Sequence, residues 1–396
     1  MTDNIVVFSG HAHRSFAHEL CDILGVELSP SRLTRFSNDC MQVQLRANCR
    51  QKDVYIVQPL VPPTQENLME LLMMVDAARG AWAAHLTVVM PHYAYARSDK
   101  KDAPGISLGG RLVADLLSAA GATRVVTMAL HAEQVHGFFS VPVDHLTALP
   151  VIASHFKSLD LSNAVVVSPD FGNAKQANNF ARMLGVGVAA GSKRRQADDK
   201  VVIDTVVGDV AGKDAILLDD EIATAGSIVT LIEKLRDLEV KSLSVACTHG
   251  LFTGQAVERL NALDCVQEVV TTNTVPQDKP IDHLTVLSVA PLFGEAIRRI
   301  HDGESVSVLF SDIDTYGDSA AAHSMSRPRR ARSCTSTWMR SMRASSNATI
   351  PICEAGRSPS AGRPPAVSWL RRAMRPAPSA CDRRCLRSRR CGNARS

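Results

Sequence analysis

Residues 215–227 read AILLDDEIATAGS, and the organisation of the chain follows from this stretch. Four apolar residues, 215–218, run directly into Asp219 and Asp220, and a loop of small residues follows at 223–227. Beyond the loop, apolar residues recur at helical spacing from Ile228 to Leu238. The pattern predicts a buried strand, a tight loop and a helix, and an unbroken apolar strand is typical of a parallel sheet covered on both faces.

The polar groups of this stretch predict a ligand. The first turn of a helix carries unpaired N–H groups at the positive end of the helix dipole, and small residues let a phosphate approach them. The two carboxylates suit a ribose diol or a network linked through Mg²⁺. We therefore interpret the stretch as a sugar-phosphate site; the alternative is an ordinary strand–turn–helix with a solvated acidic loop.

Composition places the chain among globular proteins of two or three domains, with 396 residues of which 45% are apolar. No apolar run has the length of a membrane span, and the first residues, MTDNIVVFSG, lack the pattern of a secretory signal. The ten cysteines show no metal-ligand spacing in the body of the chain, so reduced thiols and a cytoplasmic location are expected.

The charge of the chain is divided unevenly. Residues 319–396 contain seventeen Arg, no Lys and two acids, a formal charge of +15, so the chain's total of +4 leaves −11 for the residues before them. Apolar periodicity also stops there, which predicts a disordered extension, as a frameshifted reading of GC-rich DNA would produce. A basic arm that binds nucleic acid is the alternative, although the acidic body makes nucleic acid an unlikely partner.

The remaining apolar patterns predict an alternation of strands and helices. Thr64 is the expected cap of the helix at 64–79. A restart of the pattern near residues 141–150 predicts a domain boundary, and residues 192–200 are expected to form a polar loop. Strands are expected at 5–8, 54–57, 86–90, 125–130, 165–167, 201–207, 245–248, 267–273, 284–289 and 305–310, and helices at 64–79, 108–120, 174–184 and 295–301.

Several strand ends carry further candidate site residues. The loop at 92–101 combines aromatic rings with cations, which fits a nucleotide about as well as a solvated surface loop. His131 follows a strand, and a residue at the carboxyl end of a parallel strand faces the crevice where such folds bind ligands. Asp170 is a possible Mg²⁺ ligand, and the cations at 193–195 could clamp a polyphosphate or merely aid solubility. His11 and His13 are interpreted as loop residues rather than metal ligands.

Together these motifs resemble one family. The stretches NLMELLMMVDAAR (67–79), LHAEQVHGFF (130–139), SPDFGNAK (168–175), KRR (193–195) and TNTVPQ (272–277) are similar to those of ribose-phosphate diphosphokinases, the phosphoribosyl pyrophosphate synthetases. The resemblance covers about residues 4–316. It implies an α/β fold of two similar type I phosphoribosyltransferase-like domains with parallel sheets, 1–146 and 147–318, followed by the Arg-rich tail, 319–396.

The resemblance also implies an activity and its residues. The family transfers the diphosphoryl group of ATP to the anomeric hydroxyl of ribose 5-phosphate, with Mg²⁺ as cofactor, and assembles as homo-oligomers, typically hexamers. Its metal-linked positions match His131 and Asp170, and its catalytic cations match Lys193 and Arg195, with His131 also catalytic. Its ribose 5-phosphate site matches Asp219, Asp220, Ala223, Thr224, Ala225, Gly226 and Ser227. Its ATP site matches Phe36, Asn38, Arg97, Ser98, Asp99 and Lys100, of which Phe36 and Asn38 reach across from a neighbouring subunit.

The chain departs from the family at a few of these places. It has Cys40 where Glu is usual, Ser98 for Gln, Ala129 for Asp and Asn173 for Gly, positions that bear on nucleotide choice and on the pyrophosphate loop. Three functions therefore compete: an active diphosphokinase, a non-catalytic or weakly active regulatory relative of that enzyme, and a phosphoribosyltransferase or phosphoribosyl-binding regulator. Retention of His131, Asp170, Lys193 and Arg195 favours the enzyme.

Overall fold

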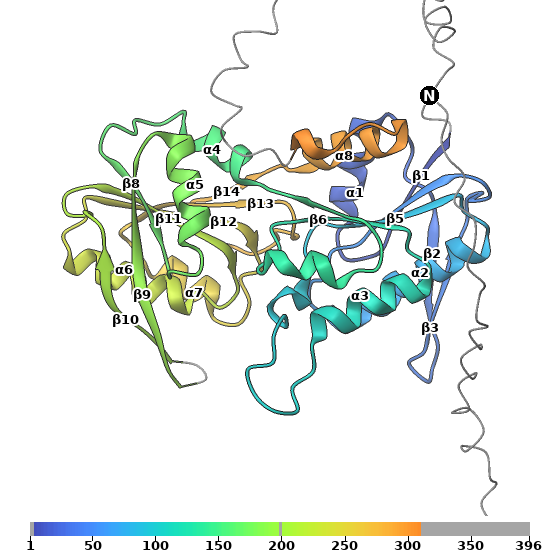
Figure 1. Ribbon diagram of the computed structural model, residues 1–396, viewed down its shortest axis with the longest axis horizontal. Coiled ribbons are helices and arrows are strands. Elements are labelled where there is room, and N and C mark those ends of the chain that lie inside the picture. Colours follow the sequence, from blue (N-terminus) through green and yellow to red (C-terminus); the bar gives the residue numbers. More distant parts are fainter. Residues whose placement is uncertain (1–3, 198–199, 310–396) are drawn as a thin grey trace, which may run out of the picture. The chain divides into compact units, whose positions relative to one another are not determined.

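Two mainly parallel sheets form the frame of the computed structural model, which describes residues 4–197 and 200–309 apart from the side chains of 193–197 and 200–204 (Figure 1). All the described residues belong to one unit, Met1–Ser326. Among them, no helix has both the length and the apolar character needed to cross a membrane.

The first sheet is parallel throughout and has five strands. Their order is β1 (Ile5–Ser9), β4 (Asp53–Val57), β5 (His85–Met90), β6 (Arg124–Met128) and β7 (Val143–Leu146). The helices α2 (Thr64–Gly80) and α3 (Gly109–Ala120) contact each other on one side of this sheet, and α1 (Arg14–Leu24) lies on the other (Figure 1).

The second sheet has seven strands, all parallel except the strand at one edge, which pairs antiparallel with its neighbour. Their order is β10 (Lys200–Val207), β9 (Gly187–Ala197), β8 (Ala164–Ser168), β11 (Asp214–Ile222), β12 (Ser242–Gly250), β13 (Val266–Thr272) and β14 (Leu284–Leu287). The helices of this half are α4 (Leu149–Phe156), α5 (Ala174–Leu184), α6 (Gly226–Asp237) and α7 (Ala256–Asn261), and α8 (Ala290–Asp302) follows β14.

One apolar core joins the two halves. It contains residues of α1 and α8 together with residues of α4, α5 and both sheets. Phe16 on α1 meets Phe293 on α8 edge to face at 5.5 Å, and Phe156 meets Phe180 in the same way at 6.1 Å. Because burying one such ring stabilises the fold by about 1.5–3 kcal/mol, this shared core holds the two sheets in a fixed relation.

Most predicted elements are present, and three expectations were wrong. Residues 192–197 belong to strand β9 instead of a polar loop, because they pair with β10. The expected closing strand at 305–310 is a 3₁₀ turn, Ser307–Leu309, and Phe310 lies outside the described residues. The cap of α2 is Pro63, without a side-chain hydrogen bond, and Thr64 is already helical.

The sequence patterns did not reveal every element. The helices α1, α4 and α7 were not predicted, nor was the hairpin of β2 (Ser31–Arg35) and β3 (Met41–Leu45). The hairpin strands are only half-buried, so they lack the apolar run that marks the other strands. The polar segment 36–40 is the turn of this hairpin.

Candidate active site

The strand ends of the two sheets meet at one place. His131 follows β6 of the first sheet, and its Nδ1 lies 2.6 Å from Oδ2 of Asp220 on β11 of the second. Close by, Nε2 of His249 on β12 lies 3.2 Å from the carbonyl oxygens of Met128 and Ala129. The structure thus brings together His131 and the predicted ribose residues, and it places them where open α/β folds bind ligands.

The acid pair is buried in part and its two members differ. Burial, and then the charge of Asp220, raise the pKa of Asp219 well above its usual range. Burial would raise the pKa of Asp220 too, but hydrogen bonds with His131 and Asp219 lower it below the usual range. The bond to Asp220 in turn raises the pKa of His131 against the effect of burial. Asp220, paired with His131, is therefore the more acidic member of the pair, and Asp219 is the member that binds a proton more readily.

The sugar-phosphate loop, residues 223–227, has the predicted conformation of a loop entering a helix. Ala225, the residue before α6, is left-handed with φ of 60°, and no side chain caps the helix. The carbonyl oxygen of Thr224 accepts a hydrogen bond of 2.8 Å from Arg259, and that of Ala223 accepts one from Thr253 N. These two hydrogen bonds fix the backbone of the loop through its carbonyl oxygens, and the first N–H groups of the twelve-residue helix remain available to an anion.

The loop after β8 lies beside the acid pair. Oδ1 of Asp170 accepts a hydrogen bond of 3.0 Å from Asn173 N, and the Asn173 amide donates to the carbonyl of Leu218 on β11. The charge of Asp170 contributes, after burial and Asp220, to the raised pKa of Asp219. Asp170, Asp219 and Asp220 therefore share one region of negative charge at the ends of two adjacent strands.

These donors fit Mg²⁺ held jointly with a substrate. Among residues 4–197 and 200–309, no group of three or more His, Cys, Asp and Glu side chains encloses a metal position. Mg²⁺ is typically held by one or two carboxylates, with substrate phosphates and water completing its shell. The carboxylates of Asp170, Asp219 and Asp220 at these strand ends are donors of the kind that this mode of binding uses.

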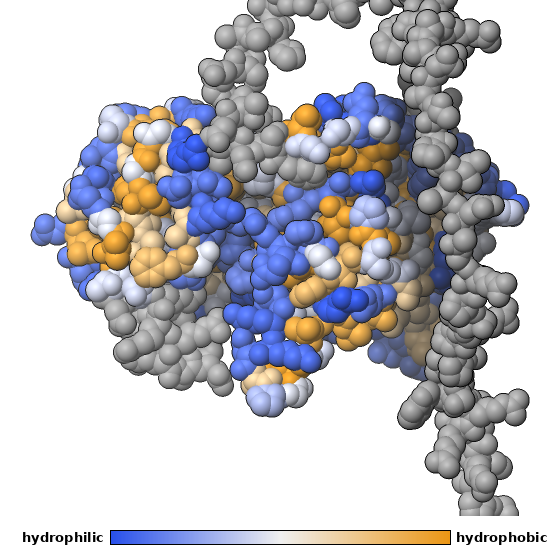
Figure 2. All heavy atoms as spheres, viewed as in Figure 1, coloured by the Kyte–Doolittle hydropathy of each residue, from blue (hydrophilic) through white to orange (hydrophobic). Residues whose placement is uncertain are grey.

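The candidate ATP residues occupy two separate places. Arg97 ends the 3₁₀ turn Ala94–Arg97, and its Nη2 lies 3.3 Å from Oε1 of Glu221. The segment after it, residues 98–107, projects below α3 in Figure 1 and is largely hydrophilic in Figure 2. In it, Ser98 accepts a hydrogen bond from Gly109 N, Asp99 accepts one from Gln134, and Lys100 lies 3.9 Å from Asp102.

Phe36 and Asn38 are not brought to this cleft. They lie in the turn of the β2–β3 hairpin, which Figure 1 shows on the side of the first sheet away from β11. Phe36 is 49% exposed, and Asn38 Oδ1 accepts a hydrogen bond from Cys40 N. The two catalytic cations, Lys193 and Arg195, lie on β9, and their side chains are outside the described part of the structure.

Sequence reasoning missed Glu221 and His249 at the cleft, and it included His92 only as part of the loop at 92–101. Glu221 extends the acid pair by one residue, and its carboxylate contacts His92 and Arg97 of the first half. His92 in turn meets His249, with ring centroids 4.9 Å apart. His92 follows β5 and Pro91, and His249 is the second-last residue of β12. Their positions at strand ends could have marked them as candidate site residues.

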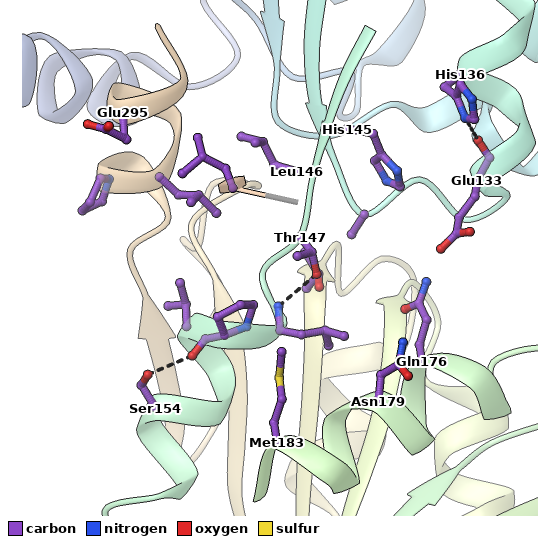
Figure 3. Close-up of a pocket in the computed structure, with 18 of the residues that line it drawn as sticks. Glu133, His136, His145, Leu146, Thr147, Ser154, Gln176, Asn179, Met183 and Glu295 are labelled. Atoms are coloured by element: carbon purple, nitrogen blue, oxygen red, sulfur yellow. Dashed lines mark hydrogen bonds between the residues drawn. The ribbon is translucent and has the colours of Figure 1, made fainter. Parts of the chain in front are cut away.

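A cavity of about 770 Å³ lies beside this cleft (Figure 3). Its wall combines residues of α5, including Gln176 and Asn179, with Glu295 of α8 and the segment that joins β7 to α4. Burial lowers the pKa of His145 in this wall, and its Nε2 accepts a hydrogen bond of 2.8 Å from Leu130 N. None of the described site residues predicted from the sequence lines this cavity, and a smaller space lies between His131, Glu221 and His249.

Comparison with known proteins assigns the family. The N-terminal domain of ribose phosphate pyrophosphokinase matches residues 5–121, and the phosphoribosyl synthetase-associated domain matches residues 196–311. A ribose-phosphate pyrophosphokinase of Deinococcus radiodurans is 50% identical over 315 residues, which is 78% of this chain and 98% of the relative. This chain belongs to the ribose-phosphate pyrophosphokinase family. A further relative, from Streptomyces coelicolor, is 63% identical over 309 residues, with the same two coverages.

A solved structure supports the same assignment for the fold. The phosphoribosylpyrophosphate synthetase of Mycobacterium smegmatis is 37% identical, with a TM-score of 0.70, and the match covers 76% of this chain and all of that one. The predicted family, the fold class and the enzyme class, a ribose-phosphate pyrophosphokinase, are therefore confirmed.

Proposed function

We propose that this pyrophosphokinase transfers the diphosphoryl group of ATP to the anomeric hydroxyl of ribose 5-phosphate and that it requires Mg²⁺. The bond between the α- and β-phosphates of ATP breaks, AMP leaves, and the hydroxyl loses its proton as its oxygen joins the β-phosphorus. The observation that carries the proposal is the contact of His131 with Asp220, because it joins the nucleotide half to the pentose half at the ends of their strands.

The pentose end of the site is supported by the geometry of β11 and α6. The 5-phosphate would lie on the uncapped first turn of α6, with the hydroxyls of Thr224 and Ser227 as further donors. Asp219 and Asp220 precede the loop and would accept hydrogen bonds from the ribose diol. Ala223, Ala225 and Gly226 have no side chain that would exclude the phosphate from the backbone.

The nucleotide end depends on cations and metal. Mg²⁺ would neutralise the phosphates of ATP and would be held by Asp170 and by the Nε2 side of His131, whose Nδ1 is engaged by Asp220. Arg97 and, three residues further along the chain, Lys100 would bind the triphosphate, and Ser98 and Asp99 belong to the same segment. Lys193 and Arg195 would stabilise the transferring group, since phosphoryl transfer depends on positioning and charge neutralisation.

Assembly is part of the proposal. The exposed turn with Phe36 and Asn38 would serve the ATP site of a neighbouring subunit in a homo-oligomer, for which a hexamer is the family precedent. We also propose the division into an ATP half, 1–146, and a pentose half, 147–318, and a cytoplasmic location, where ATP and sugar phosphates are available.

The activity is tested by AMP release from ATP with and without ribose 5-phosphate and Mg²⁺. We expect release only when all three are present, and loss of about a hundredfold or more in Lys193→Ala, as for removal of a transition-state cation. Lys157→Ala, an exposed lysine after α4, is the matched control and should retain activity. Absence of release in the purified protein, together with no effect of Lys193→Ala in a mixed assembly with an active relative, would support a regulatory role instead.

The shared site is tested by complementation. Phe36→Ala/Asn38→Ala and Lys193→Ala damage different parts of the proposed site, so a co-expressed mixture contains some sites with neither change. We expect each variant alone to be nearly inactive and the mixture to regain part of the activity, at a hexamer's mass in light scattering. A fully active monomer, or a mixture as inactive as its components, would contradict the shared site.

A further inference from the structure

Glu221 is the one residue of the acidic strand end that reaches both an arginine and a histidine of the other half in the described structure. It follows the ribose acids on β11, and its side chain is 10% exposed. Its two carboxylate oxygens are engaged separately: Oε2 lies 3.1 Å from Nε2 of His92, and Oε1 lies 3.3 Å from Nη2 of Arg97. One side chain on the pentose strand therefore fixes two positions of the nucleotide half.

The side chain of His92 is fixed by its buried neighbours. Its side chain is 2% exposed, and Nδ1 lies 2.8 Å from the carbonyl oxygen of Leu60. A carbonyl oxygen only accepts, so Nδ1 carries a hydrogen, and the contact of Nε2 with Glu221 needs a second hydrogen on Nε2 or on the carboxyl group. On its other side the ring stacks edge to face on His249, which is itself held by Thr274 and by the end of β6. The position of Glu221 is therefore set by buried, hydrogen-bonded neighbours.

Arg97 is the more exposed member of the contact. It is 48% exposed, and a long, half-exposed side chain loses rotamer entropy when it is held in one place. A buried carboxylate that is already fixed can hold one end of the guanidinium before the ligand arrives, so that less rotamer entropy is lost when the ligand binds. Because Glu221 engages Nη2, the remaining N–H donors of the guanidinium stay available for a phosphate.

We propose that Glu221 is a positioning residue for ATP: from the pentose strand it holds Arg97 in the orientation that receives the triphosphate, with His92 as its support. The proposal rests on the proposed function, because it assigns Arg97 to ATP. It predicts that loss of the Glu221 carboxylate weakens the use of ATP far more than the use of ribose 5-phosphate, although Glu221 belongs to the strand that binds the sugar.

The first test separates the two substrates. Glu221→Gln keeps the shape of the side chain and removes its charge, and we expect the KM for ATP to rise about tenfold while the KM for ribose 5-phosphate stays within about twofold. Glu233→Gln on the exposed face of α6 makes the same chemical change and should alter neither constant. An unchanged or lower KM for ATP would overturn the proposal; a lower value would mean that Glu221 withholds Arg97 from ATP.

A double-mutant cycle tests the pathway through Arg97. In an Arg97→Ala background, Glu221→Gln should have no further effect on the KM for ATP, because its target is absent. A role confined to general stability would give the same change in both backgrounds, and that result would contradict the proposal. Melting temperatures of all four proteins identify any loss of folding.

Glu221→Gln leaves His92 without its charged partner, so a second variant preserves the fold. His92→Phe/Glu221→Met replaces the buried pair by apolar side chains of similar volume, a change that is often neutral or stabilising. It should fold as the wild type does and still show the higher KM for ATP. A wild-type KM for ATP in this folded variant would refute the positioning role.

Failure of the proposed function would be recognised separately. If the wild type releases no AMP in the presence of ribose 5-phosphate and Mg²⁺, binding of α,β-methylene-ATP, whose α–β link cannot be cleaved, is measured instead by calorimetry. Glu221→Gln should then bind this analogue about tenfold more weakly than the wild type and Glu233→Gln do. Equal binding by all three would overturn the positioning role as well.

Discussion

His249 is buried at the junction of the two halves as a neutral ring. Its Nε2 faces two carbonyl oxygens and must carry the hydrogen, while Nδ1 lies 2.9 Å from the hydroxyl of Thr274. Burial, and then the nearby His92, lower the pKa of His249 to about 4. An unfolded histidine has a pKa of about 6.5, so between about pH 4 and pH 6.5 this residue is protonated in the unfolded state and neutral in the native state.

This difference predicts that the protein loses stability in weak acid. As pH falls below about 6.5 the unfolded chain gains the proton first, and the free energy of unfolding should drop by about 2 kcal/mol between pH 8 and pH 5 on account of His249 alone. Urea unfolding of wild type and His249→Asn at fixed protein concentration measures this drop in the free energy of unfolding. The His249→Asn variant should be less stable at pH 8, and its free energy of unfolding should fall by about 2 kcal/mol less than that of the wild type on acidification. For His18→Asn, on the exposed face of α1, the free energy of unfolding should fall by as much as for the wild type.

At the start of α6 the backbone N–H groups of the helix, rather than any one side chain, are the proposed phosphate donors. The helix has no side-chain cap, and the loop before it is held by Arg259 and Thr253, so its N–H groups have a fixed direction. Thr224 adds a hydroxyl at the entrance. A hydrogen bond to a charged group contributes about 1.5–3 kcal/mol, and the hydroxyl of Thr224 should have this value towards the 5-phosphate.

Thr224→Ala should therefore lower kcat/KM for ribose 5-phosphate by about ten- to a hundredfold and leave the KM for ATP within about twofold. Thr230→Ala is the matched control, since Thr230 lies one turn into the same helix and its hydroxyl donates to the carbonyl of Gly226. Steady-state kinetics with each substrate varied in turn measures both effects. Equal kinetics of the two variants would remove Thr224 from the phosphate site.

The hairpin of β9 and β10 carries the proposed catalytic cations, and Gly208 fixes where it leaves the sheet. Gly208 has φ of 123°, and a Cβ there would lie 2.8 Å from Cα and 2.6 Å from Cβ of Ala189 on β9. Gly212 also has a positive φ, of 66°, but a Cβ there would have no neighbour within 4 Å. Only the first glycine is required for close approach of the backbone as well as for its conformation.

Gly208→Ala should lower the free energy of unfolding by about 3 kcal/mol, the sum of backbone strain and overpacking. Gly212→Ala should cost about 1 kcal/mol, since it adds the strain alone. Chemical denaturation of both variants measures the difference, and activity at a temperature where both are folded shows whether the hairpin still presents its cations. Equal stabilities would mean that the hairpin shifts to accept the methyl group.

At the level of elements, the sequence revealed what apolar periodicity encodes and missed what tertiary contacts decide. The strand, loop and helix of 215–227 were predicted because burial on both faces requires an unbroken apolar run, and β11 indeed ends in the acids. Residues 192–197 were assigned to a loop because their side chains are polar, but backbone pairing with the edge strand β10 makes them part of β9. Glu221 was passed over because its partners, His92 and Arg97, are more than a hundred residues away in sequence.

The whole molecule is organised by the core that α1, α4, α5 and α8 share. Because Phe16 and Phe293 join α1, which follows the first strand, to α8, which follows the last, the shared core links the two sheets within the described residues. His131 and Asp220 then meet without a flexible connection between their halves. In the proposed reaction, the distance between the pentose and the nucleotide is therefore set by the shared apolar core, which lies away from the reacting groups.

This arrangement predicts that the Arg-rich tail is dispensable for activity. The Streptomyces relative aligns over 98% of its own length with 78% of this chain, and the shared core and every proposed site residue lie before residue 310. A chain ending at residue 318 should keep kcat/KM for both substrates within about twofold of the full chain.

The same truncation tests whether the tail binds nucleic acid. Removing a formal charge of +15 leaves an acidic protein, so any binding of DNA should disappear, whereas the full chain would bind DNA weakly and more so at low salt. Fluorescence anisotropy with a labelled duplex at several salt concentrations measures this beside the activity assay. A loss of activity of tenfold or more on truncation would show that the tail contributes to the enzyme, and its position relative to the cleft would then become part of the mechanism.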